Sequence, residues 1–173
     1  MKTLILNCNP DVDYVTFDKH ISQLKNNLSN KQVEVELIQV RDLELSDCIG
    51  CYVCWLKTPG LCVYKDGMHD VLSAFVNVDK VILASPVKIN FVSPLCKRVR
   101  DRMLPLVHPY LKIEGDRMSH LARYDKLPEQ IIVLDQTENI EHIQSVYTPK
   151  QEGGNEIYNI EDLEGITNAI FSD

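Results

Sequence analysis

The sequence lacks any apolar run long enough to span a membrane. A spanning helix needs about 20 consecutive apolar residues, whereas the longest run near the N-terminus is Leu4-Ile5-Leu6, also too short for a signal-peptide core. Basic residues are in deficit, since 18 Lys and Arg stand against 25 Asp and Glu and give a net charge of −7. That balance disfavours binding to nucleic-acid phosphates. We therefore expect a cytoplasmic protein whose partners include neither a membrane nor a nucleic acid.

Several catalytic motifs are also missing. The sequence contains no Gly-x-Ser-x-Gly, no Walker A sequence and no His-Glu-x-x-His, so acyl transfer, nucleotide hydrolysis and zincin-type proteolysis have no support. Its 173 residues, with 45% hydrophobic and 25% charged, predict one globular domain over residues 1–173.

Segments with the hydrophobic pattern of strands alternate along the chain with segments that have the pattern of helices. Short apolar runs predict buried strands at 2–7, 33–40, 81–84 and 131–134, with a shorter edge strand at 157–158. Three- and four-residue spacing predicts amphipathic helices at 14–28, 66–76, 93–103 and 160–171. Asp66 and Ser93 are the expected N-caps of the second and third helices, and the last helix is expected to bury Leu163, Ile166, Ile170 and Phe171. Continuous apolar strands alternating with helices predict a doubly wound α/β fold around a parallel sheet.

Ligands of such sheets bind beyond the carboxyl ends of the strands. The loops at 8–16, 86–92 and 135–139 are therefore the expected ligand-binding region. Residues 105–128 fit neither period, and we expect an irregular excursion that covers a site or packs against a partner chain. Residues 151–155 are expected to form a turn or a mobile loop.

Four of the six cysteines lie within fifteen positions, in a cysteine-rich loop over residues 48–62. Cys48, Cys51, Cys54 and Cys62 have the spacing C-x2-C-x2-C-x7-C. Closely spaced thiolates suit an iron–sulfur cluster, zinc would also accept four thiolates, and free cysteines can simply pack a long loop. Spacing alone leaves these alternatives open. Cys8, at the end of a strand, and Cys96, inside a predicted helix, are expected to be core residues.

The residues around these cysteines form a longer pattern. Cys48-Ile-Gly-Cys51-Tyr-Val-Cys54-Trp55 is followed by Ser85-Pro86-Val87, Ser93, Lys97 and Asp101-Arg102. The combination resembles the flavodoxin-like NADPH-dependent FMN reductases and the related iron–sulfur flavoproteins, and it covers roughly the first 128 residues.

The resemblance implies a flavodoxin-like sheet in the order 2-1-3-4-5 with FMN at the topological switch point. NAD(P)H would be the reductant. The electron acceptor would be a quinone, a flavin or a similar small molecule, and the protein would form a homodimer or homotetramer. The phosphate end of FMN would contact Asn9, Pro10 and Thr16. The ring would contact Pro86, Val87, Lys88, Ile89, Asn90 and Phe91. In the iron–sulfur branch, Cys48, Cys51, Cys54 and Cys62 would hold a [4Fe-4S] cluster.

Two acidic residues set this sequence apart from that pattern. Asp11 and Asp13 lie in the expected phosphate loop, where a carboxylate opposes a phosphate dianion. This favours an alternative, in which the domain has lost FMN and acts as a binding or assembly module. A third hypothesis is an iron–sulfur flavoprotein that carries electrons.

The basic residues of the third helix allow two interpretations. Lys97, Arg98, Arg100 and Arg102 could bind the 2′-phosphate of NADPH or could form a solvated or dimer-facing surface. No residue is assigned a catalytic role by sequence alone.

Overall fold

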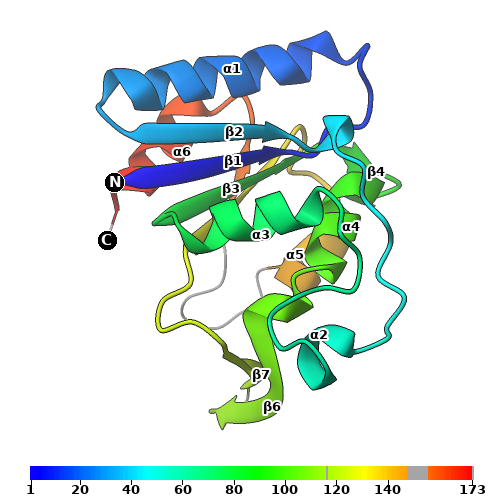
Figure 1. Cartoon of the computed structure of the whole chain (residues 1–173). Coiled ribbons are helices and arrows are strands. Elements are labelled where there is room, and N and C mark those ends of the chain that lie inside the picture. The colour runs from blue at the N-terminus through cyan, green and yellow to red at the C-terminus, as the bar shows by residue number, and fades with distance from the viewer. Residues whose placement is uncertain (116, 148–155, 173) are drawn as a thin grey trace.

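The computed structural model describes residues 1–115, 117–147 and 156–172 (Figure 1). Its centre is a five-stranded sheet in the order β2-β1-β3-β8-β9, in which every neighbouring pair is parallel. The strands are β1 (Lys2–Asn7), β2 (Glu34–Gln39), β3 (Lys80–Ser85), β8 (Glu129–Leu134) and β9 (Glu156–Asn159). The predicted flavodoxin-like doubly wound α/β fold and its 2-1-3-4-5 order are confirmed. The loop expected at 151–155 lies outside the described residues.

Helices cover both faces of the sheet. One face packs against α1 (Val15–Asn30) and α6 (Leu163–Phe171), and the other against α3 (Met68–Val76), α4 (Pro94–Asp101) and α5 (Glu141–Tyr147) (Figure 1). Alternate side chains of β1 enter opposite cores: Ile5 packs with the α1 side, and Leu4 and Leu6 pack with the α3 side. Because both faces of β1 are covered, its sequence is continuously apolar rather than alternating. No helix in the described ranges is long and apolar enough to cross a membrane.

The helix boundaries follow their capping residues. Ser93 caps α4 as predicted, since its Oγ accepts a hydrogen bond from the Cys96 N–H at 3.1 Å. Asp66 is not the N-cap of α3: the cap position is Gly67, although Asp66 Oδ1 accepts from the Met68 N–H at 3.2 Å. The α6 helix begins at Leu163 rather than at residue 160, because Asp162 is its cap and accepts from the Gly165 N–H at 2.9 Å.

The prediction of which α6 side chains are buried is partly wrong. Ile166 and Ile170 are fully buried, but the side chain of Phe171 is 48% exposed at the end of the helix. Its ring lies 5.6 Å from Nζ of Lys31, at the end of α1.

The sequence patterns missed several short elements. These are α5, the single turn α2 (Val53–Leu56) inside the cysteine-rich loop, the two-residue strands β4 (Val87–Lys88) and β5 (Phe91–Val92), and the 3-10 turns η1 (Val40–Asp42) and η2 (Leu104–Leu106). The strands and single turns among them are too short to display a full hydrophobic period, and α5, with seven residues, buries only Ile143 and Tyr147.

Residues 105–128 form an excursion from the central sheet, but the expectation that it is irregular is wrong. After η2 the chain forms an antiparallel hairpin of β6 (Val107–Glu114) and β7 (Arg117–Ala122), which projects away from the central sheet (Figure 1). Apolar side chains of this hairpin are exposed on both strands, among them Tyr110, Ile113 and Met118. The alternation that marks a half-buried strand is therefore missing from the sequence.

Candidate functional site

The loops that follow β1, β3 and β8 meet at the carboxyl edge of the sheet. Asp135, directly after β8, accepts a hydrogen bond from the Val87 N–H at 2.8 Å. Burial and the nearby charge of Asp135 raise the pKa of Tyr14, in the loop after β1. One carboxylate thus joins the three loops that were expected to bind a ligand, at the switch point between β1 and β3.

The loop after β1 is held by its own polar groups. Asn9 is fully buried, its Oδ1 accepts from the Asp11 N–H at 3.0 Å, and its Nδ2 donates to the Asp11 carbonyl at 2.9 Å. The Asp13 N–H donates to Asp11 Oδ1 at 3.0 Å. Asn9 therefore shapes the loop, whereas Pro10 and Thr16 are exposed at its surface.

The N-terminus of α1 has no side-chain cap, although its first amide, the Val15 N–H, donates to the Asp13 carbonyl at 2.8 Å. Its N-cap residue, Tyr14, makes no side-chain capping hydrogen bond, and the first-turn amides of a helix have no acceptor within the helix. The exposed Thr16 lies in this turn. An uncapped helix of sixteen residues that begins at the switch point is a typical phosphate site.

The acidic residue of that first turn is neutralised. Asp18 pairs with Arg41 at 2.9 Å and accepts from Asn7 Nδ2 at 2.7 Å. Burial works to raise the pKa of Asp18, but the hydrogen bonds from Arg41, Asn7 and Asn9 outweigh it and lower the pKa. The Asp18–Arg41 pair itself therefore adds no net charge beside the start of α1.

On the opposite side of the switch point, β4 and β5 form a tight hairpin. Its two turn residues, Ile89 and Asn90, have φ values of 52° and 56°, the left-handed conformation that a type I′ turn requires at both positions. A β-branched residue rarely adopts this conformation, and the side chain of Ile89 is fully exposed. Lys88 is also exposed, while Val87 and Phe91 are half-buried. This hairpin is the segment expected to lie against a flavin ring.

The base of this hairpin is fixed to the sheet. Ser93 Oγ donates to the Cys8 carbonyl at 2.7 Å, and the Ser93 N–H donates to Ser85 Oγ at 2.8 Å. Pro86, Ser85 and Ser93 are all buried. The exposed tip therefore stands on a rigid support, as a ligand-positioning loop requires.

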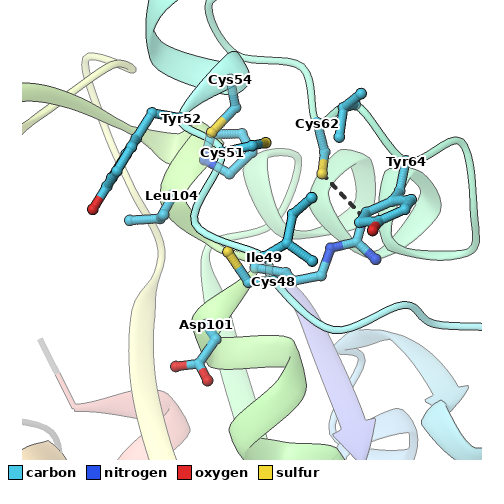
Figure 2. A pocket seen from close by; sticks show the side chains of 12 residues that line it. Cys48, Ile49, Cys51, Tyr52, Cys54, Cys62, Tyr64, Asp101 and Leu104 are labelled. Carbon is cyan, nitrogen blue, oxygen red and sulfur yellow. Dashed lines mark hydrogen bonds between the residues drawn. The ribbon is translucent and has the colours of Figure 1, made fainter.

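The four predicted ligand cysteines surround a single pocket some distance from these loops (Figure 2). Cys54 is buried on α2, Cys62 is half-buried, and Cys48 and Cys51 are exposed. Burial and the neighbouring charges of Cys62, Cys48 and Cys51 raise the pKa of Cys54. All six cysteines are free thiols, and Cys8 and Cys96 are fully buried core residues, as predicted.

Arg102 lies at the wall of this thiol pocket, which the sequence patterns did not indicate. It is 2% exposed, and its Nη2 donates to Cys62 Sγ at 3.3 Å. Its Nη1 pairs with Asp66 Oδ2 at 2.5 Å. Burial works to raise the pKa of Asp66, but hydrogen bonds from Arg102 and from the N–H groups of Ser46 and Met68 lower it to about 2.

The other basic residues of α4 are engaged at the surface. Lys97 pairs with Asp101 at 2.5 Å, and Arg98 pairs with Asp47 at 2.5 Å. Arg100 donates to Gln130 at 2.6 Å. These contacts fit the solvated-surface interpretation better than a free phosphate-binding patch.

Both predicted cofactors suit the residues present. The uncapped start of α1 and the exposed Thr16 offer donors to the phosphate of FMN, and the β4–β5 hairpin offers a surface to its ring. The thiol pocket offers four sulfurs to a cluster. Within the described ranges, no three Cys, His, Asp or Glu side chains converge on a site for a metal ion, so the four thiols line one pocket without forming a closed ligand set.

Comparison with known sequences decides the family. Residues 1–115 match the sequence family described as NADPH-dependent FMN reductase. The chain belongs to the NADPH-dependent FMN reductase family. The predicted family is therefore confirmed. Within it, an iron–sulfur flavoprotein of Methanocaldococcus jannaschii is 35% identical over 86 residues, which make up 50% of this chain and 44% of that protein. An iron–sulfur flavoprotein of Archaeoglobus fulgidus is 36% identical over 100 residues, 57% of this chain and 44% of that protein. The chain spans less than half the length of these curated relatives.

Solved structures of flavodoxin-like proteins share the fold of this FMN reductase family member. An FMN-dependent NADH-azoreductase from Bacillus anthracis in complex with FMN matches with a TM-score of 0.64 and 11% identity, over 99% of this chain and 100% of that one. A protein of Streptococcus mutans matches with a TM-score of 0.59 and 12% identity, over 98% of this chain and 96% of that one. At these identities the likeness shows the fold alone.

Proposed function

We propose that this chain is an FMN-dependent oxidoreductase that receives reducing equivalents from NAD(P)H and passes them to a quinone, a flavin or a similar small acceptor. The observation that carries the proposal is the convergence of three loops on Asp135 at the switch point of a family member. When bound, FMN supplies the hydride and electron chemistry.

The residues of the chain supply binding, orientation and exclusion of water. The first turn of α1 and the hydroxyl of Thr16 bind the phosphate. The hairpin tip, with Lys88, Ile89 and Asn90, covers the ring edge, and the hydrogen bonds of Ser93 hold the hairpin in place. The pocket lined by residues 135–139 and Asn159 completes the polar side of the site.

Titration of the purified protein with FMN tests this function. We expect quenching of flavin fluorescence, a higher melting temperature, and NAD(P)H oxidation in the presence of a quinone. Thr16→Val should weaken FMN binding, while Thr58→Val, on the exposed cysteine-rich loop, serves as a matched control. Neither quenching nor a thermal shift at excess FMN would refute the proposal and favour the alternative of a binding or assembly module.

The thiol pocket supports a second candidate function, that of an iron–sulfur flavoprotein that carries electrons. In this proposal Cys48, Cys51, Cys54 and Cys62 hold a [4Fe-4S] cluster, which supplies one-electron transfer. The favouring observation is that all four thiols line one pocket, and the relatives named above are iron–sulfur flavoproteins. Iron and sulfide analysis of anaerobically prepared protein tests it: four of each per chain is the expected result, and none after reconstitution would exclude it.

We also propose that the chain forms a homodimer or homotetramer. The exposed apolar side chains of the β6–β7 hairpin support this, since contiguous exposed apolar surface is typical of interfaces. Light scattering with size-exclusion chromatography should give a mass of two or four chains. Replacing Ile113 and Met118 by Ser should lower it. A monomer mass for the unaltered chain would refute the proposal.

A further inference from the structure

Arg102 makes contacts on both sides of the cysteine-rich loop. Its Nη1 donates to the Ser46 carbonyl at 3.1 Å, just before the loop, and to Asp66 Oδ2 after it. Its Nη2 donates to Cys62 Sγ, the last thiol of the loop. The Ser46 N–H donates to the same Asp66 oxygen at 2.9 Å. One guanidinium thus joins the two ends of a loop that carries four thiols.

The burial of this arginine is costly. Removing a charged group from water costs several kcal/mol unless partners replace its hydration, and Arg102 is 2% exposed. Asp66 compensates the charge, and the ring of Tyr64 lies 5.5 Å from the guanidinium carbon. Its Nε–H, however, is buried with no hydrogen-bond partner among the described residues. A buried donor without an acceptor, beside a pocket lined with thiols, suits a site that gains negative charge when it is occupied.

We propose that Arg102 is the positioning residue of the thiol pocket: it fastens both ends of the cysteine-rich loop and donates a hydrogen bond to the sulfur of Cys62. This inference rests on the second candidate function. A hydrogen bond from a positive group to a ligand sulfur stabilises the additional electron of a reduced cluster. Arg102 therefore holds the cysteine-rich loop closed around the thiols, and it would raise the reduction potential of a cluster bound there.

The test compares two variants with the unaltered chain. The double variant Arg102→Met with Asp66→Leu removes both buried charges together, which proteins commonly tolerate. The variant Arg102→Lys keeps the positive charge but loses the planar guanidinium, which donates hydrogen bonds in two directions. Lys97→Gln is the matched control, because Lys97 lies on α4 and pairs with the exposed Asp101 of the same helix rather than with the cysteine-rich loop.

The first readout uses metal-free protein under reducing conditions. Lys-C cleavage after Lys57, inside the cysteine-rich loop, should be about tenfold faster in the double variant than in the unaltered chain, because the loop opens more often. The Lys97→Gln control should be cleaved after Lys57 at the unaltered rate. Equal rates for the double variant and the unaltered chain would overturn the positioning role. Thermal unfolding verifies that each variant is folded, and Arg102→Lys gives the comparison if the double variant is not.

The second readout uses anaerobically reconstituted protein. The double variant should lose iron to a chelator tenfold or more faster than the unaltered chain, and its reduction potential should be lower. Unchanged iron loss and an unchanged potential would overturn the role of Arg102 toward the bound group. If even the unaltered chain retains no iron, the second candidate function fails, and the cleavage rates still decide whether Arg102 fastens the loop.

Discussion

The buried ion pair between Asp66 and Arg102 predicts a specific dependence of stability on pH. Its carboxyl has a pKa of about 2 in place of the usual 3.8 and is only 12% exposed. Because the folded pKa is lower than the unfolded one, the ionised carboxylate stabilises the fold above pH 4, and the stabilisation is lost as the pH falls toward 2. A depression of this size corresponds to about 2 kcal/mol of unfolding free energy at neutral pH.

Asp66→Asn removes this contribution and leaves the guanidinium of Arg102 buried without its counterion. Breaking a buried pair in this way costs about 3–5 kcal/mol, so we expect a loss of that order at pH 7. At pH 3 the carboxyl is largely protonated in the unfolded chain, whose pKa is the ordinary 3.8, but still ionised in the folded one. The difference between the two proteins should therefore shrink by about 1 kcal/mol.

Urea unfolding between pH 7 and pH 3, with a thiol reductant present, measures both quantities. Trp55 is the single tryptophan, and its Nε1 donates to the Leu104 carbonyl at 2.9 Å, so its fluorescence reports on the packing of the cysteine-rich loop. Glu34→Gln is the control, since Glu34 is 74% exposed and pairs with Lys2 at the surface; it should change stability by less than about 1 kcal/mol. A difference between Asp66→Asn and the unaltered protein that is the same at pH 7 and pH 3 would refute the reasoning.

Three further predictions concern the loops. Ser93→Ala should lower the unfolding free energy by about 2–4 kcal/mol, measured by urea unfolding, because α4 loses its cap and the buried Cys8 carbonyl loses its donor; a loss below 0.5 kcal/mol would contradict this. Gly60→Ala should be destabilising by about 1 kcal/mol or more, since φ is +87° and the added Cβ would lie 3.3 Å from the Arg123 side chain, and the cost should exceed that of Gly50→Ala, where nothing lies within 4 Å. Asp13→Asn should tighten FMN binding about twofold to fivefold at low salt, because a negative charge near the phosphate is removed. Fluorescence titration should find a smaller effect at high salt. Equal FMN affinities of the variant and the unaltered chain at low salt would disprove this prediction.

The spacing of apolar residues predicted an element correctly where the same pattern of burial continues along its whole length. Phe17, Ile21, Leu24 and Leu28 are buried on α1 at the predicted spacing, because a surface helix buries one face at its own period. The continuous apolar runs of β1 and β3 likewise predicted a parallel sheet covered on both faces. The β6–β7 hairpin was not predicted from the sequence. Apolar side chains of this hairpin are exposed, so its sequence has no pattern of one buried and one exposed face.

The sequence by itself determined the long helices, the buried strands and the four thiols of one loop, since each depends on neighbouring residues or on short spacings. The strand order was implied only by the resemblance to a known family. Only the tertiary structure brought Asp135 to Val87 and Tyr14, and Arg102 to Cys62 and Asp66. These contacts join residues separated by 36 or more positions. No local period encodes them, because they arise where parallel strands end at one edge of the sheet and where α4 ends against the cysteine-rich loop.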